Sequence, residues 1–208
     1  MHLTIRVPAL SGRPVASNST RQNIIERTVM LIARKGLQGA SFSQILEESG
    51  APRGSLYHHF PGGKDELVLE AIVLAGDQAL AVLDALTGKS AEEVATTFVS
   101  LWRALLSHSD FSASCSIAAV TVATDSVTLR ERAGEIFRTW RTRLAELLED
   151  GGVPAGRGTA VAASLIAACE GAVILSRAEK SMETFNLVTG EQLSLIKEIS
   201  KGWSPKRG

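Results

Sequence analysis

Apolar residues recur at steps of three and four along most of this 208-residue chain, and Gly, Pro or short polar segments separate the runs. The first run begins near Thr20, and one stripe of it consists of Ile24, Ile25, Thr28, Leu31 and Ile32. This spacing is typical of amphipathic helices, whereas a half-buried strand would alternate apolar and polar residues. Such alternation is found nowhere. The sequence therefore predicts an all-α fold of about nine helices.

Capping residues and helix breakers set the expected ends of these helices. Ser41 with Gln44, and Ser90 with Glu93, have the spacing of capping boxes. Gly50 can end a helix in the left-handed conformation. The expected ranges are about 20–36, 41–49, 53–60, 64–86, 90–107, 115–123, 126–150, 155–180 and 182–200.

The polar N-terminal segment and the most apolar segment of the chain give two further expectations. Residues 1–19 are rich in Ser, Pro, Gly and Asn and lack the long apolar run of a signal peptide, so we expect a flexible N-terminal arm. Residues 160–175 are the most apolar stretch, but they are short and contain Glu170. A buried helix is expected there, and no membrane span.

The cysteine and histidine spacings argue against a metal site, and no cofactor is expected. Cys115 and Cys169 form no C-x-x-C pair and have no histidine at ligand spacing, so a reducing cytoplasm is the simplest location. His58 and His59 are adjacent, and neighbouring helical side chains point about 100° apart. They are poorly placed to hold one ion together.

Charge is distributed unevenly, although the net charge of the whole chain is zero. Residues 1–64 contain eight Lys and Arg residues against three Glu residues, a net charge of +5. A basic end suits a nucleic-acid-binding module, because neutralising phosphates supplies much of the affinity. Ordinary scatter of surface charge remains the alternative at this point.

Three short expected helices followed by a long one have the order of a helix-turn-helix domain. The helix at 41–49 would brace the helix at 53–60, and Gly50 would permit the tight turn between them. Leu56 and Phe60, four residues apart, would face the core. The opposite face of the helix would enter the major groove, which is wide enough for one helix.

The segment Ser41–Phe60 resembles the helix-turn-helix of the TetR/AcrR family of transcriptional regulators, and the resemblance extends over about residues 20–70. The glycine of the turn, the Leu56–Tyr57 pair and Phe60 have the family's spacing. The run from Phe60 to Lys64 has one residue more than the commonest spacing. In this it resembles the LmrA/QdoR-type subgroup with a YxaF-like C-terminal domain, as do segment 115–120 and Trp140–Arg141.

The resemblance implies a DNA-binding domain over residues 20–66 and an effector-binding and dimerisation domain over 67–203. Arg53 would read a base, because a guanidinium can bond guanine O6 and N7 together. Gly54 would allow close backbone approach, and Lys64 resembles the family's phosphate-contacting lysine, although the extra residue affects its placement. The remaining DNA contacts, mainly to phosphates, would come from Ser43, Gln44, Ser55, Tyr57, His58 and His59.

A homodimer is also implied, because a two-fold operator needs a two-fold protein. The expected helix at 155–180 carries small residues that would let two helices approach closely. The candidate interface residues are Ala163, Ile166, Ala167, Glu170, Gly171 and Ile174. A helix buried within one monomer is the alternative interpretation.

The central helices supply candidates for an apolar effector cavity, which would bind a small apolar or aromatic molecule. These candidates are Phe98, Trp102, Phe111, Cys115, Ile117, Thr121, Phe137, Trp140 and Glu170. Aromatic residues at helical spacing are also typical of a plain core. Glu170 is costly to bury without a partner. It could bond the ligand, cross a dimer interface to an arginine, or reach solvent.

The sequence thus predicts a cytoplasmic, ligand-responsive regulator, most simply a repressor that binds a palindromic operator as a dimer. An effector would shift the population toward a form whose two reading helices no longer match successive grooves, about 34–36 Å apart. An activator or architectural protein without small-molecule control would dock in the same way. An enzyme is not expected, because G-x-S-x-G, HExxH and a phosphate-binding loop are all absent.

Overall fold

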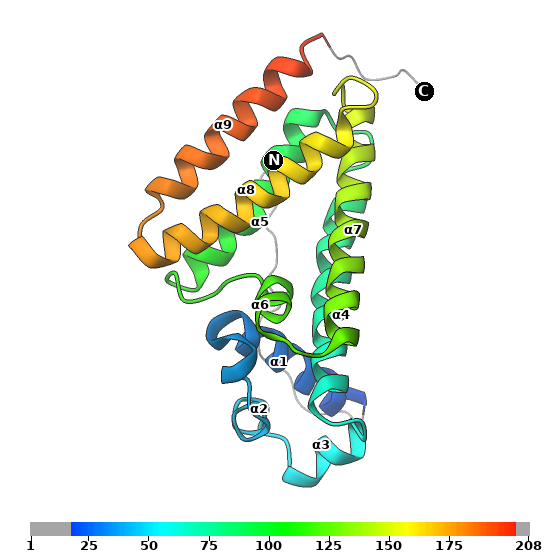
Figure 1. The fold of residues 1–208 in the computed structure, drawn as a ribbon, viewed down its shortest axis with the longest axis vertical. Coiled ribbons are helices and arrows are strands. Elements are labelled where there is room, and N and C mark those ends of the chain that lie inside the picture. Colours follow the sequence, from blue (N-terminus) through cyan, green and yellow to red (C-terminus); the bar gives the residue numbers. More distant parts are fainter. Residues whose placement is uncertain (1–17, 203–208) are drawn as a thin grey trace.

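Residues 18–202 of the chain are described by a computed structural model, and all regular secondary structure in this range is helical (Figure 1). The all-α expectation is confirmed. Residues 1–17 of the predicted arm lie outside the described range, and its last two residues open the first helix. The helices are α1 (Asn18–Gly39), α2 (Phe42–Ser49), α3 (Arg53–His59), α4 (Lys64–Asp84), α5 (Ala91–His108), α6 (Ser116–Ala123), α7 (Val127–Asp150), α8 (Gly158–Glu179) and α9 (Glu183–Ile199).

The capping patterns predict the helix starts with mixed success. Ser90 and Glu93 form both bonds of a capping box at the start of α5. Ser41 caps α2 by accepting the N–H of Gln44 at 3.3 Å, but the return bond from the Gln44 side chain does not form among the described residues. Ser126 precedes α7 without capping it through its side chain.

The backbone N–H groups at the start of α8 are bonded by a side chain of another helix, which local sequence patterns do not reveal. A carboxylate oxygen of Glu149, near the end of α7, accepts the N–H groups of Gly156 at 3.0 Å and Gly158 at 2.8 Å. A negative group is favourable at a helix N-terminus, where N–H groups lack partners within the helix. Helix α8 therefore begins at Gly158, three residues after the expected start at Ala155.

The molecule has a small head of α1, α2 and α3 below a larger helical body (Figure 1). Helix α4 joins the two, running upward from the head beside α7, while α8 and α9 pack on each other across the upper body. The predicted boundary at residues 66–67 falls within the first turn of α4. Movement of α4 would therefore be transmitted directly to the head.

Helix α8 is long and apolar enough to cross a membrane by length and composition alone. It packs instead against α5, α7 and α9. Its inward face includes fully buried Leu165 and Cys169. The helix is a core element, as the sequence predicts.

Helices α4 and α7 approach closely where Gly76 meets Ile136. A Cβ atom at Gly76 would lie 2.8 Å from the Cγ2 methyl of Ile136, and the indole Nε1 of Trp140 donates to the Gly76 carbonyl at 3.0 Å. Real carbon atoms do not come this close without a shift. The glycine is thus required by packing.

Gly76→Ala is expected to be less stable than Gly134→Ala by about 1–3 kcal/mol, because overpacking costs this much in a filled core. Gly134 lies in α7, where an added Cβ would meet only the flexible end of Arg138. Both substitutions gain the same helix propensity, so the difference between their free energies of unfolding reports the clash of the new Cβ with Ile136. Urea unfolding of the two variants measures it, and equal midpoints and slopes would contradict the packing role of Gly76.

Candidate nucleic-acid interface and effector cavity

Helix α3 is held on one side by two buried apolar residues and is open on the other. Leu56 is 1% exposed and Phe60 is fully buried. Gly50 adopts φ 65° in the turn before α3, where its N–H bonds the Leu46 carbonyl at 2.9 Å. These contacts fix the orientation of α3 relative to α2, as the sequence predicts.

The open side of α3 carries most of the predicted DNA-contacting residues. Arg53, Gly54, Tyr57 and His58 are exposed, and Tyr57 is 70% exposed despite its size. Its ring also packs edge-on against Phe42 of α2, with 5.9 Å between centroids. Such a contact orients the phenol while leaving its hydroxyl end accessible.

The other predicted contacts lie around this helix. Ser43 is exposed on α2, close to the Ser41 hydroxyl at 3.0 Å. Gln44, Ser55 and His59 are half-buried. The structure thus brings the predicted α2 and α3 residues to one end of the molecule, and contact of each with DNA remains a prediction.

Lys64 has a partner within the protein that the sequence did not reveal. Its ammonium group donates to the backbone carbonyl of Leu37 at 3.0 Å. Leu37 follows Gly36, whose φ of 71° and ψ of 175° interrupt α1. An ammonium group has three donors, so this bond ties α4 to the end of α1 and leaves two for a phosphate.

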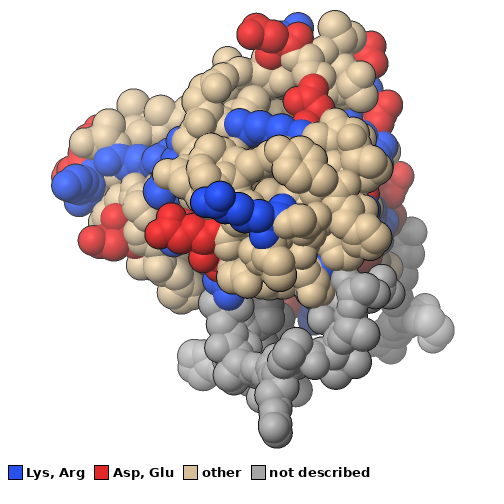
Figure 2. Space-filling view, turned by 90° about the horizontal axis from the view of Figure 1, so that it is seen from below, with Lys and Arg blue, Asp and Glu red and all other residues tan. Residues whose placement is uncertain are grey.

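The charges of the head are partly neutralised, but that of Arg53 is not. Arg21 pairs with Glu70, and Arg34 pairs with Glu48. Within residues 18–202, Arg53 makes no ion pair. Figure 2 shows the lower end of the molecule, where Lys and Arg side chains cross the middle of the face and Asp and Glu lie mainly toward its edges.

Comparison with known proteins agrees with this geometry. Residues 24–71 match the family model described as bacterial regulatory proteins, tetR family. Residues 91–191 match that of the transcriptional regulator LmrA/YxaF-like, C-terminal domain. An uncharacterized HTH-type transcriptional regulator of Mycobacterium tuberculosis is 31% identical over 183 residues, covering 85% of this chain and 93% of the relative. The chain is a TetR-family transcriptional regulator.

Further relatives agree with the subgroup and the fold. The HTH-type transcriptional regulator LmrA of Bacillus subtilis is 29% identical over 173 residues, covering 78% of this chain and 88% of the relative. A solved TetR-family regulator from Cytophaga hutchinsonii is 26% identical, with a TM-score of 0.72 over 91% of this chain and all of its own. A regulator from Legionella pneumophila, 21% identical, shares the fold with a TM-score of 0.76 over 89% of this chain and all of its own. The family binds DNA, and its members are transcriptional regulators, not enzymes.

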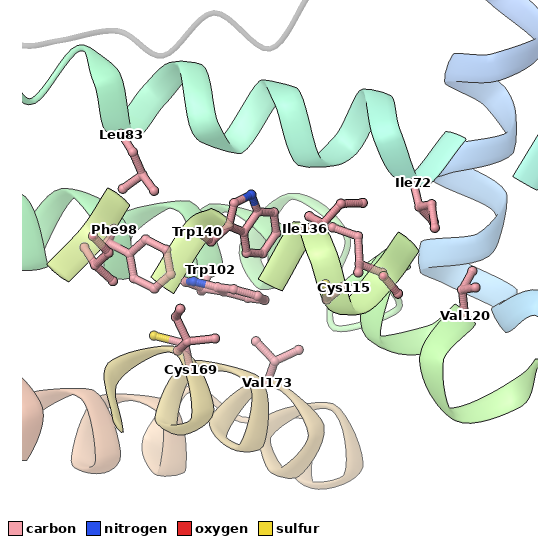
Figure 3. Close-up of a cluster of buried hydrophobic side chains, with 14 of the residues drawn as sticks. Ile72, Leu83, Phe98, Trp102, Cys115, Val120, Ile136, Trp140, Cys169 and Val173 are labelled. Atoms are coloured by element: carbon pink, nitrogen blue, oxygen red, sulfur yellow. The ribbon is translucent and has the colours of Figure 1, made fainter. Parts of the chain in front are cut away.

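The body of this TetR-family regulator contains a cavity of about 330 Å³ between α1, α4, α5, α6 and α7. Five predicted effector residues line it: Phe98, Trp102, Cys115, Ile117 and Trp140. Figure 3 shows the two tryptophans close together in this cluster. The sequence did not reveal the remaining lining residues, which are Val29, Ala33, Ala75, Gln78, Ala79, Val82, Leu101, Leu105, Ser114 and Ser116.

The other four effector candidates lie outside the lining. Phe137 packs on Trp140 with 5.6 Å between ring centroids, and the Thr121 hydroxyl bonds the Ile117 carbonyl at 2.8 Å. Phe111 lies in the loop before α6. Glu170 lies on α8 beside the Cys115 thiol. Each of these residues could act on the cavity only through a neighbour.

Burial sets the ionisation of the groups near this cavity. The carboxyl oxygen Oε1 of Glu170 is buried without a hydrogen-bond partner, and burial raises the pKa of Glu170 to about 7. Burial and the nearby Glu170 carboxylate raise the pKa of Cys115 well above its usual range, and that of Cys169 to about 12. Both cysteines are free thiols and are not activated as nucleophiles.

A second hollow, of about 480 Å³, lies between α1, α4 and α7. Six of the side chains that line it are charged: Arg21, Glu70, Asp77, Glu131, Arg132 and Glu135. An apolar molecule would have to compete with water for these groups. The smaller cavity is therefore better suited to an apolar effector.

The segment Ser109–Cys115 connects the body to the head. At one end, Arg177 of α8 donates to the carbonyls of Phe111 at 3.3 Å and Ser112 at 3.0 Å. At the other end, the backbone N–H and the hydroxyl of Ser114 both donate to the Ala33 carbonyl of α1, at 2.8 and 3.2 Å. Ser114 also lines the cavity, so a group that binds there contacts a residue bonded to the head.

The predicted dimer residues divide between surface and interior. Ala163, Ala167 and Ile174 are exposed on α8, and Gly171 is half-buried. Ile166 is only 8% exposed and belongs to the core of the protomer, and the Glu170 carboxyl also turns inward. Three exposed leucines extend the apolar surface around α8 and α9: Leu175, Leu187 and Leu195.

Proposed function

We propose that this regulator is a repressor that binds a palindromic operator as a homodimer and is released by a small, mainly apolar effector. The observation that carries the proposal is the geometry of α3. Its inner face is fixed by Leu56 and Phe60, while Tyr57 and Arg53 are exposed and Arg53 has no ion pair in the described part of the chain. The functional division would follow residues 20–66 for DNA and 67–203 for effector and dimer.

Arg53 would contact a base, and neighbouring residues would contact phosphates. A guanidinium at the start of α3 can bond one guanine at two positions, which gives specificity. Hydroxyl, imidazole and ammonium groups from Ser43, Tyr57, His58 and Lys64 would fix the register on phosphates. This division predicts different effects of substitution on selectivity and on salt dependence.

Exposed apolar side chains on α8 and α9 support the homodimer. Ile174 is 62% exposed and Leu187 is 65% exposed, whereas Leu165, Cys169 and Phe185 of the same two helices are fully buried. Large exposed apolar side chains on neighbouring helices are typical of a contact site. Two copies related by a two-fold axis would cover these side chains with four helices, two from each protomer.

Ile174→Glu is expected to convert dimers into monomers at micromolar concentration and to weaken operator binding by roughly tenfold or more, because a charge would be buried at the interface. Light scattering after size-exclusion chromatography measures the mass. Val122→Glu is the matched control, since Val122 is 85% exposed on α6. An unchanged dimer mass in the α8 variant, or equal loss in both, would contradict this interface.

Release of DNA by the effector would depend on the contacts around the cavity. Ser114 and Ala33 both line it and are bonded to each other, and Trp140 is bonded to the backbone of α4. A molecule that displaces these groups would favour another position of α1 and α4, and hence of α3. Binding would shift the population away from the DNA-competent form by its difference in affinity for the two forms.

Selection of bound sequences from random DNA, followed by mobility-shift titration of the selected duplex, tests the function. We expect a palindromic consensus, a dissociation constant that rises steeply with salt, and release of the duplex by an apolar compound that also raises the melting temperature. Equal affinity for every duplex would refute the proposal that the protein recognises a specific operator sequence. Selective binding that no effector relieves would refute the proposed control.

A further inference from the structure

The loop between α5 and α6 contains two consecutive residues with positive φ. Asp110 has φ 48° and Phe111 has φ 59°, and Lys180 is the only other non-glycine residue with positive φ in the described part of the chain. Residues with a side chain rarely adopt this left-handed region, and a bulky aromatic residue there is an outlier. Such conformations persist only where surrounding contacts hold them, and they are concentrated at functional sites.

Bonds within the loop hold the N–H groups of this turn. The N–H of Phe111 bonds the Leu106 carbonyl at 3.0 Å, and the N–H of Ser112 bonds the Ser109 carbonyl at 3.0 Å. The ring of Phe111 packs against the core. The carbonyl groups of Phe111 and Ser112 are bonded from outside the loop, by a side chain of α8.

Arg177 provides both of these outside bonds. Its Nε donates to the Phe111 carbonyl at 3.3 Å, and its Nη2 donates to the Ser112 carbonyl at 3.0 Å. A guanidinium presents its donors in a rigid planar fork, so one side chain can fix two successive carbonyl groups. Arg177 therefore holds the left-handed turn from α8, a helix far from it in the sequence.

Arg177 also lies beside the surface of α8 that is proposed to bind a second protomer. Ile174, which is 62% exposed, lies three residues before Arg177, and residues at this spacing are neighbours on a helix surface. Leu175 is 48% exposed in the same turn. A second copy packed on Ile174 would therefore set the position of the helical turn that carries Arg177.

The other end of the loop is bonded to the head. Ser114, two residues after Ser112, donates its N–H and its hydroxyl to the Ala33 carbonyl of α1. Figure 1 shows the loop running from the lower end of α5 to α6, above α1. Helices α7 and α4 form a second connection from α8 to α1. Loss of the Arg177 bonds should therefore alter the position of the head without releasing it.

We propose that Arg177 is a positioning residue for operator binding: it holds the Asp110–Phe111 turn and thereby helps to keep the two heads of the dimer at the separation of successive major grooves. The inference rests on the proposed function, because it requires a dimer and a palindromic operator. It adds the residue that couples the dimer contact to α1. Arg177 acts through the loop and not by touching DNA.

Arg177→Ala is expected to weaken binding of the full palindrome by roughly 3- to 30-fold, the range for substitutions that alter coupling between distant sites. Affinity for a duplex with a single half-site should be unchanged, because one head can occupy it whatever the separation of the two heads. Arg177→Lys cannot present a planar fork to two carbonyls and should be intermediate. Mobility-shift titration at one salt concentration measures these affinities, and light scattering measures the dimer mass.

Arg143→Ala is the matched control. Arg143 is also half-buried, and it bonds the Asp84 carboxylate at 2.6 Å and the Thr87 hydroxyl at 2.7 Å. These contacts join the end of α4 to α7 at the end of the body opposite the head (Figure 1). Loss of an arginine with comparable bonds should there leave affinity for both duplexes unchanged.

The distance between the two heads provides a measurement that a merely structural role would not change. Glu47 is exposed on α2, whereas Cys115 and Cys169 are buried, so a nitroxide on Glu47→Cys reports the position of each head. Double electron–electron resonance is measured on the DNA-free dimer. Arg177→Ala should give a broader or displaced distance distribution than the wild-type protein or Arg143→Ala.

An unchanged distance distribution, or equal losses of affinity for the half-site and the full palindrome, would overturn the inference. If Arg177→Ala does not form a folded dimer, the same two comparisons made with Arg177→Lys decide the question. Failure of the proposed function looks different, because the wild-type protein itself would then be monomeric or bind no palindrome. A wild-type dimer that binds its palindrome, with an unchanged Arg177 variant, would refute only the role of Arg177.

Discussion

Replacement of Arg53 by alanine is expected to weaken operator binding by about 1–3 kcal/mol for each half-site and to relax the preference at one base pair. The side chain is exposed at the start of α3 and has no ion pair among the described residues. Its removal should therefore leave the fold intact. Mobility-shift titration against the selected operator and against duplexes altered at single positions measures both effects.

Two controls separate base reading from charge. Arg53→Lys keeps the charge but cannot bond a guanine bidentately, so selectivity should fall while the salt dependence is largely retained. Arg157→Ala removes the same charge from the exposed loop before α8, at the opposite end of the molecule from α3 (Figure 1), and should leave binding unchanged. Unaltered operator affinity in Arg53→Ala would refute the assignment.

Glu170→Gln is expected to stabilise the protein at pH 8 by on the order of 3–4 kcal/mol, because it removes a carboxyl that burial keeps from ionising freely. Burial raises the pKa of Glu170 to about 7 in the folded chain, against about 4.3 when unfolded. Below about pH 4 the carboxyl is neutral in both states and the two proteins should be similarly stable. Between pH 4.3 and 7 the folded state binds more protons, so the wild-type chain loses stability as pH rises. Well above pH 7, where the carboxyl is ionised in both states, the difference becomes constant.

Urea unfolding of both proteins at pH 5, 6, 7 and 8 measures this difference. Glu131→Gln is the matched control, since Glu131 is exposed on α7 and its substitution should produce no comparable trend. A stability difference that does not grow between pH 5 and pH 8 would show that the Glu170 carboxyl finds a partner when it ionises. An arginine of a second protomer, one of the alternatives considered for this residue, would produce that result.

The sequence predicted the head well because its determinants are local. Gly50, Leu56 and Phe60 act within a few residues of the turn that they define, and a helical period assigns the inner and outer faces of α3 directly. The Ser41 cap is local in the same way. The resemblance to TetR-family proteins then assigned a function to the outer face.

The cavity was predicted only in part, because helical periodicity identifies buried faces without showing which of them surround a void. Phe137 and Thr121 belong to the right helices but do not line the cavity. The contributions of Val29 and Ala33 depend on how α1 packs beneath α6. The Lys64–Leu37 bond likewise joins residues 27 positions apart, beyond the reach of any local pattern.

The bond between residue 114 and the Ala33 carbonyl has a consequence for how this protein can diverge. Its shorter component, at 2.8 Å, comes from the main chain, so almost any amino acid at position 114 would preserve it. Proline, which lacks the N–H, is the exception. Under the proposed function, the side chain at position 114 could therefore change to suit a new ligand during evolution while the main-chain bond between the cavity wall and α1 is kept.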